Sequence, residues 1–201
     1  MVYNDKMENT LFTEFIALSS RLRKEYPKSL GEKDIHWEEI FRTITTNIPD
    51  FFRTIYENVS GTRRNIQKQE LFDFIPGYRL IHILELENES NVLKNMKWDK
   101  QNQKIIPFLA NYSSDYICYA KMGKECVVSI MHDSPDIVVM HNDTFKFFET
   151  ICAFYKDGVY YIDDDGYLDC DFDKQGKIGA KLNQDITYWT EIDTIGGGKY
   201  D

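Results

Sequence analysis

Cysteines and histidines are the residues of this chain whose chemistry most often supports catalysis. Cys118 and Cys126 lie in apolar runs, and His132 and His141 follow in the same part of the sequence. A thiol and an imidazole that meet in a fold can act as a nucleophile and its base. However, the sequence has no Gly-x-Ser-x-Gly and no recognisable cysteine motif, and buried thiols are usually inert. We therefore expect no catalytic residues and a protein that is not an enzyme.

Carboxylates gather near the C-terminal end, where residues 163–165 are all aspartate and precede Gly166. Such a cluster suggests calcium, but an EF-hand loop with this glycine in its turn would begin at Tyr161 and end at Phe172. Neither residue offers the carboxylate that those positions need. The four cysteines also contain no Cys-x-x-Cys pair, the spacing typical of zinc and redox sites. We therefore expect no metal, no cofactor and no disulfide.

The negative charge is concentrated in the last third of the chain. The 201 residues carry a formal net charge of −9. Between Asp133 and Asp193 there are fourteen acidic residues and five lysines, so this segment holds the whole net charge. Such a field repels nucleic acid and attracts cationic partners, although it would also serve solubility alone. We expect a basic protein partner and no direct contact with nucleic acid.

The composition indicates a folded domain outside the membrane. Hydrophobic residues make up 42% of the chain and aromatic residues 14%, which is enough for the core of one domain. No apolar run approaches the roughly 20 residues that span a bilayer. The N-terminal sequence MVYNDKMENTLF has no basic region followed by an apolar stretch, as a secretory signal would. We therefore expect a cytoplasmic protein with no membrane partner.

The stretch 105–120 organises the predicted fold. It reads as a buried strand that ends at Pro107, a polar loop at 111–114 and a second strand from Asp115. Apolar residues alternate between the two faces of that second strand, so both faces are expected to be covered. Further short apolar runs, separated by turn residues, continue to Met140. This spacing predicts a sheet of antiparallel strands.

Helical spacing of apolar residues surrounds the predicted sheet. It predicts helices at 8–26, 34–44, 49–59, 85–98 and 143–156. An Asp-Gly turn then joins aromatic runs at 159–162 and 167–170, which is typical of a hairpin. The tail at 182–195 has Ile186, Tyr188 and Trp189 to pack back on the domain.

The fold class is therefore α+β, with one main domain. Residues 1–30 form an N-terminal helix that extends this domain. Residues 31–157 form the domain itself, and residues 158–195 form a hairpin and tail that pack on it.

Short motifs in a fixed order carry a family resemblance. Residues 48–61 contain Ile-Pro-Asp-Phe-Phe and a following Gly turn, and residues 76–80 read Pro-Gly-Tyr-Arg-Leu. Ile-Pro-Phe at 106–108 precedes Asp-Tyr-Ile-Cys at 115–118, and His-Asp stands at 132–133. These segments resemble the motifs of the SUKH superfamily, which includes fungal cell-wall-assembly regulators of the Smi/Knr type and many bacterial immunity proteins.

The resemblance covers roughly residues 34 to 156 and has two departures. The loop 111–114 lacks the glycines that the family usually has there, and residues 1–30 have no counterpart. The resemblance implies a non-enzymatic domain in which N-terminal helices pack on a mainly antiparallel sheet, with a closing C-terminal helix and an extra hairpin.

The resemblance also implies a function. Bacterial members commonly bind and neutralise a toxin, often a nuclease, and a nuclease has a basic cleft for phosphates. The expectation is thus an immunity protein that neutralises a cognate, basic protein toxin through an acidic surface. A regulatory scaffold, as in the fungal branch, is the alternative. A small-molecule enzyme would require turnover that depends on His132 or Cys118.

Candidate partner-binding residues lie on the predicted loops. They are Asp115, Asp133 and Asp136 at strand ends, Asp163, Asp164 and Asp165 on the hairpin, and the aromatic anchors Tyr112 and Tyr167. Asp115 suits a turn or capping role equally well. The three hairpin aspartates also fit a plain solvated turn.

Overall fold

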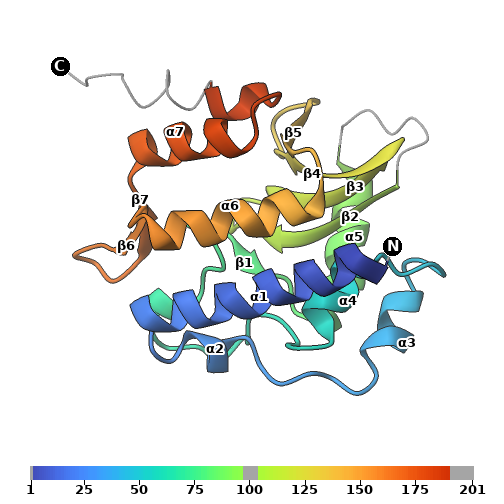
Figure 1. Ribbon diagram of the computed structural model, residues 1–201. Helices are drawn as coiled ribbons and strands as arrows, with labels where there is room; N and C mark the ends of the chain where they lie inside the picture. Colours follow the sequence, from blue (N-terminus) through green and yellow to red (C-terminus); the bar gives the residue numbers. More distant parts are fainter. Residues whose placement is uncertain (1, 97–103, 191–201) are drawn as a thin grey trace.

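A five-stranded antiparallel sheet forms the centre of the molecule, as the computed structural model of the protein shows for residues 2–96 and 104–190 (Figure 1). Its strands follow the chain order: β1 (Arg79–Leu80), β2 (Lys104–Ala110), β3 (Tyr116–Met122), β4 (Lys124–Ile130) and β5 (Ile137–His141). Each neighbouring pair is antiparallel. The predicted α+β class and antiparallel sheet are therefore confirmed.

Helices cover both faces of this sheet. They are α1 (Val2–Leu22), α2 (Tyr26–Ser29), α3 (Trp37–Arg42), α4 (Asp50–Tyr56), η1 (Gln69–Leu71), η2 (Ile83–Glu85), α5 (Leu86–Asn95), α6 (Thr144–Lys156) and α7 (Phe172–Leu182). The hairpin of β6 (Tyr160–Ile162) and β7 (Leu168–Cys170) forms a second, two-stranded sheet.

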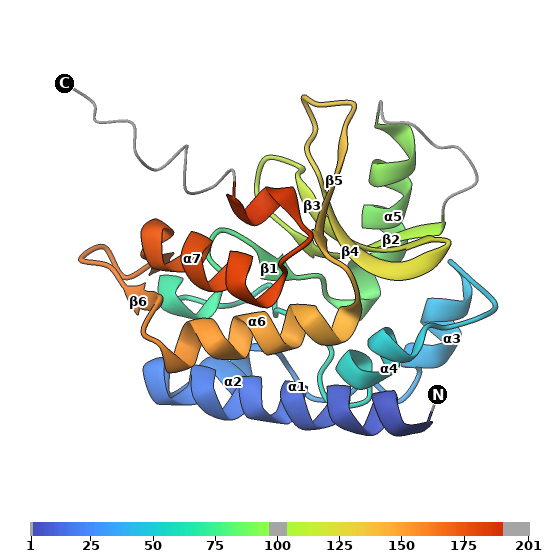
Figure 2. The ribbon, with the colours of Figure 1, turned by 45° about the horizontal axis from the view of Figure 1, so that its top comes forward.

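The alternation in β3 places its side chains as the sequence predicts. Tyr119 faces α4, where its ring centroid lies 6.3 Å from that of Phe51. Tyr116 points to the opposite face, where its hydroxyl donates to Glu89 of α5 at 2.7 Å. Figure 2 shows α5 on the side of the sheet away from α6. Because both faces are covered, the strand is apolar on both.

The predicted end of the first strand at Pro107 is wrong, since β2 continues to Ala110. The register between β2 and β3 shifts between Pro107 and Leu109. Proline lacks the N–H that a regular ladder uses and is tolerated in sheets at such bulges. The proline therefore marks an irregularity within the strand.

Helix α1 lies alongside α6 in Figures 1 and 2. The ring of Phe12 meets that of Phe148 edge-on at 5.7 Å, and Lys156 pairs with Glu14 at 2.9 Å. The predicted helix at 8–26 begins earlier and ends at Leu22. Residues 1–30 were assigned to the domain as an extension, and these contacts join α1 directly to the helix that packs on the sheet.

Helix α7 is absent from the sequence-based prediction, which assigns no element to residues 171–181, between the hairpin and the tail at 182–195. Asp171 caps it, with a side-chain oxygen that accepts from the Lys174 N–H at 3.0 Å. Gly176 and Gly179 lower the intrinsic helix propensity, yet both are buried. A Cβ at Gly179 would collide with the indole ring of Trp189. Tertiary packing therefore stabilises a helix whose local sequence disfavours it.

This close approach predicts the effect of a small substitution. Gly179→Ala should lower the free energy of unfolding by about 1–3 kcal/mol through overpacking, although alanine is the better helix former. Chemical denaturation measures the change. Lys177→Ala on the exposed side of α7 is the control and should change stability by no more than about 0.5 kcal/mol. Stabilisation by Gly179→Ala would contradict the packing described here.

Candidate functional site

Asp115 connects two loops at one end of the sheet. Its Oδ1 accepts from the backbone N–H of His132 at 2.8 Å and lies 2.8 Å from Nδ1 of the same residue. Its Oδ2 accepts from Asn111 Nδ2 at 2.8 Å. Only 12% of the Asp115 side chain is exposed. The carboxylate thus holds the β2–β3 loop against the β4–β5 loop, which is the turn role considered above.

The two titratable groups of this pair shift in opposite directions. Burial raises the pKa of Asp115, but hydrogen bonds from His132 and Asn111 outweigh burial and leave the pKa below its usual value. The hydrogen bond to Asp115 raises the pKa of His132. The imidazolium form is therefore favoured, and its stabilising effect is lost as the pH rises through the raised pKa of His132.

Asp115→Asn should lower the pKa of His132 towards about 6.5, because the hydrogen-bonded negative charge is removed. An NMR titration of the histidine ring protons measures this shift. Asp133→Asn is the matched control: it removes a charge that contributes less to the His132 shift than Asp115 does. Equal shifts in the two variants would rule out a specific Asp115–His132 hydrogen bond.

Of the three hairpin aspartates, Asp163 stabilises the turn, and Asp164 and Asp165 are exposed to solvent. Asp163 Oδ1 accepts the backbone N–H groups of Asp165 and Tyr167 at 3.0 and 2.7 Å, so this carboxylate closes the turn. Asp164 and Asp165 are exposed, and their side chains have no hydrogen bond or ion pair among the described residues. The tip of the hairpin therefore presents two solvated carboxylates.

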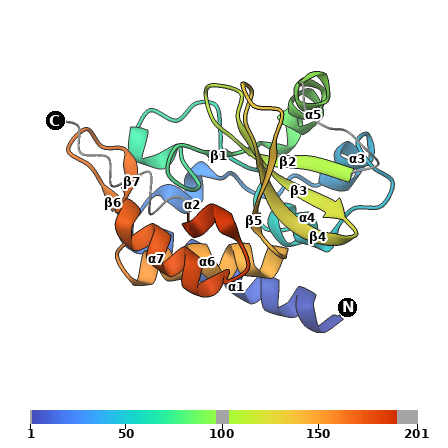
Figure 3. The same ribbon diagram turned by 90° about the horizontal axis from the view of Figure 1, so that it is seen from above.

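Asp133 and Asp136 form a second acidic group, on the β4–β5 loop. Both residues are exposed, and their carboxylates have no side-chain partner in the described part of the chain. Figures 1 and 3 place this loop well apart from the tip of the β6–β7 hairpin. The structure therefore brings the acidic candidates together as two groups and not as one continuous cluster.

The two aromatic candidates lie on the surface of the molecule. Tyr112 is 68% exposed and Tyr167 is 46% exposed. Burial raises the pKa of Tyr112, and the nearby Asp73 and Tyr167 raise it further. Because the phenol of Tyr167 acts on Tyr112, the two rings belong to one side of the molecule.

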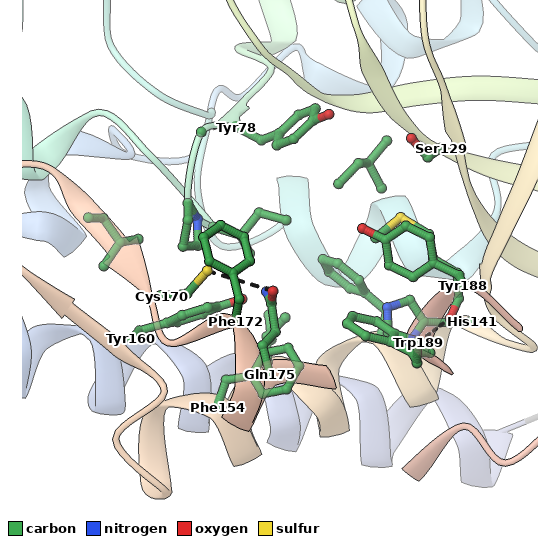
Figure 4. Close-up of a pocket in the computed structure, with 18 of the residues that line it drawn as sticks. Tyr78, Ser129, His141, Phe154, Tyr160, Cys170, Phe172, Gln175, Tyr188 and Trp189 are labelled. Carbon is green, nitrogen blue, oxygen red and sulfur yellow. Dashed lines mark hydrogen bonds between the residues drawn. The ribbon is translucent and has the colours of Figure 1, made fainter. Parts of the chain in front are cut away.

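A pocket that sequence analysis did not predict lies beside this surface. It has a volume of about 370 Å³ and is bounded by β3, β4, α6, α7 and the hairpin (Figure 4). Its walls include Phe147, Phe154, Tyr160, Tyr188 and Trp189. The aromatic residues of the predicted tail were the only sequence signal for it.

His141 stands in the wall of the pocket and is only 1% exposed. Its ring lies between those of Phe147 and Trp189, at centroid distances of 5.5 and 5.2 Å. Burial lowers the pKa of His141 to about 3. The imidazole is therefore neutral at physiological pH.

The cysteines are buried and carry free thiols. Burial raises the pKa of Cys118 and Cys126, which disfavours the nucleophilic thiolate. Within the described ranges, no three His, Cys, Asp or Glu side chains are grouped in a way that could hold a metal ion. None of the described helices has both the length and the apolar character needed to cross a membrane.

The fold and this surface define an α+β domain with an antiparallel sheet, two outward acidic groups and an aromatic pocket. A comparison of the chain with models of protein families and with curated proteins finds no match. The resemblance to the SUKH superfamily therefore rests on the sequence motifs alone.

Proposed function

We propose that the protein is a non-enzymatic binding domain of the SUKH type, a cytoplasmic immunity protein that neutralises a cognate, basic bacterial toxin. One observation carries this proposal: the negative charge of the chain is concentrated in its last third, and four carboxylates of that part are exposed on the surface. These carboxylates belong to Asp133, Asp136, Asp164 and Asp165, which are exposed and make no side-chain hydrogen bond or ion pair among the described residues.

Carboxylates of this kind suit a basic partner such as the cleft of a nuclease. An acidic surface presents to that cleft the charge that phosphates would present, and it blocks access of the substrate. Complementary fields accelerate the encounter between the partners. The exposed rings of Tyr112 and Tyr167 offer apolar contact area in addition to the carboxylates, as tyrosines often do in interfaces.

The functional test begins with the genes adjacent to this one, where a gene for a large secreted toxin is expected. Co-expression of the protein should restore growth of cells that produce the toxin domain, and the two chains should co-purify as one complex. Failure of both would contradict the proposal. Recovery of several signalling proteins and no toxin would favour the scaffold alternative.

The charge mechanism predicts a slower association for neutralised variants. Asp133→Asn/Asp136→Asn and Asp164→Asn/Asp165→Asn should each reduce the association rate with the toxin by about tenfold at low salt, within the range of electrostatic steering. Stopped-flow or surface-binding kinetics measure this rate at several salt concentrations. Glu57→Gln/Glu87→Gln is the matched control, since it removes the same charge from exposed positions outside the acidic third. An equal effect in the control would show that only net charge matters.

A further inference from the structure

The aromatic pocket contains several polar groups without a hydrogen-bond partner in the described chain. They are the hydroxyls of Tyr78, Tyr188 and Ser129 and the Nε2 atom of His141. Figure 4 shows these side chains around one cavity: Ser129 and His141 belong to β4 and β5, Tyr78 to the segment before β1, and Tyr188 to the segment after α7. An apolar pocket with a few convergent polar groups is the usual form of a small-molecule site.

The neighbours of His141 determine which of its ring nitrogens carries the proton. Asn183 Nδ2 donates to Thr150 Oγ1 and to the carbonyl of Gly179, each at 3.0 Å. Because a carbonyl only accepts, this orients the amide and places Oδ1 of Asn183 3.0 Å from His141 Nδ1. The histidine therefore donates through Nδ1–H, and Nε2 carries a free lone pair.

This lone pair is available to a ligand in the pocket. His141 makes no hydrogen bond other than the one to Asn183 among the described residues. The residue lines the pocket, and Nε2 is the ring nitrogen that its described neighbours leave without a partner. The neutral imidazole thus offers one well-positioned acceptor.

The other residues that line the pocket disfavour a charged ligand. Asp169 is the one charged side chain among the described lining residues, and its oxygens accept from Cys170 N–H at 2.7 Å and Tyr161 hydroxyl at 3.3 Å. The other lining residues are aromatic, aliphatic or neutral polar, so a charged ligand would lose its hydration without gaining a counter-ion. Flat rings can pack against Phe147, Tyr188 and Trp189.

We propose that this pocket binds a small neutral aromatic molecule with one N–H or O–H donor, such as indole or a phenol, whose donor hydrogen-bonds to Nε2 of His141. The cavity volume of about 370 Å³ falls within the range of about 300–1,000 Å³ for ligand sites. This binding goes beyond the proposed toxin neutralisation and does not depend on it.

The first experiment compares indole with 1-methylindole, which lacks the donor and is one methyl group larger. Calorimetry on the full chain should show that indole binds at least about tenfold more tightly than 1-methylindole, as expected for one hydrogen bond to a buried acceptor. The NMR signals of Tyr188 and Trp189 should shift with indole. Equal affinity of the two compounds, or shifts confined to other residues, would overturn the proposal.

The second experiment uses variants that remove the acceptor nitrogen of His141 or fill the cavity. His141→Phe should abolish the preference for indole over 1-methylindole, whereas Gln184→Ala, at an exposed position outside the pocket, should retain it. Ser129→Leu places a larger side chain in the cavity from β4 and should weaken the binding of indole and of 1-methylindole alike. This variant tests the site even if His141→Phe does not fold. Persistence of the preference in His141→Phe would contradict the role of Nε2.

The final experiment tests whether the pocket binds a free compound or a side chain of a partner protein. If a Lys-Trp-Lys peptide binds this pocket and indole does not, the occupant is a protein side chain and the small-molecule proposal fails. The variants that neutralise Asp133, Asp136, Asp164 and Asp165 should bind indole with unchanged affinity. The failure of toxin binding and the failure of ligand binding are thus separate results.

Discussion

Arg23→Met should lower the free energy of unfolding by about 3–5 kcal/mol, the range for removal of one partner from a buried charged network. Arg23 is only 1% exposed. Its guanidinium donates to the carbonyls of Glu70 and Asp73 at 3.0 and 2.6 Å and to the hydroxyl of Tyr155 at 2.5 Å. One side chain thereby joins the end of α1, the η1 region and α6. Its loss would leave one buried and two partly buried acceptors without this donor.

Urea denaturation measures this loss, and Arg21→Met is the matched control. Arg21 is exposed on the same helix and has no side-chain partner among the described residues, so its replacement should cost about 0.5 kcal/mol or less. Similar losses in the two variants would contradict the role of Arg23.

Asp73→Asn tests the electrostatic part of the same network. Burial raises the pKa of Asp73, while Gly77 and Arg23 act to lower it. Without Arg23 the buried carboxylate loses its cation, so Asp73→Asn should restore part of the stability of Arg23→Met. A double-mutant cycle measures this coupling, and strictly additive losses would show that Asp73 and Arg23 do not interact.

The second large effect is a loss of stability in acid that depends on His141. Burial lowers the pKa of His141 to about 3, whereas an unfolded histidine titrates near about 6.5. The unfolded chain therefore binds a proton in this pH window and the folded chain does not. The stabilising contribution is complete above about pH 6.5 and is lost as the pH falls towards 3, at ~1.4 kcal/mol per pH unit.

Urea denaturation between pH 4.5 and 7.5 measures this slope. His141→Gln keeps an amide donor for Asn183 but does not titrate, so its stability should fall less steeply in acid than that of the unchanged protein. His132→Gln is the control with the opposite sign, because the pKa of His132 is raised. Parallel curves for His141→Gln and the unchanged protein would contradict the neutral buried imidazole.

The sequence predicts those elements whose signals are local. Helix α6 forms within the predicted range 143–156, and Asp143 caps it with a side-chain oxygen that accepts from the Lys146 N–H at 2.6 Å. The hairpin forms around the Asp-Gly turn, and Gly166 takes a φ of +84° there. Tail residues Ile186 and Trp189 are buried, as expected, while residues 191–195 of the predicted tail lie outside the described residues. Each of these signals depends on neighbours within a few positions.

The roles of individual charged side chains could not be read in this way. Asp115 and Asp133 are equivalent in sequence terms, as aspartates at strand ends. One is held by Asn111 and His132, and the other is exposed. The difference arises because His132 returns to Asp115 from another loop, a contact between residues that are 17 positions apart.

The sequence by itself determined the α+β class, the faces of β3 and the position of the negative charge, because periodicity and composition are properties of the chain. Only the tertiary structure decided that α7 forms and that a pocket exists. Gly179 becomes favourable in a helix where Trp189 needs the space of a missing side chain. The pocket unites Tyr78, Ile117 and Tyr188 from distant segments. The physical reason is that such sites consist of long-range contacts, and no local pattern encodes them.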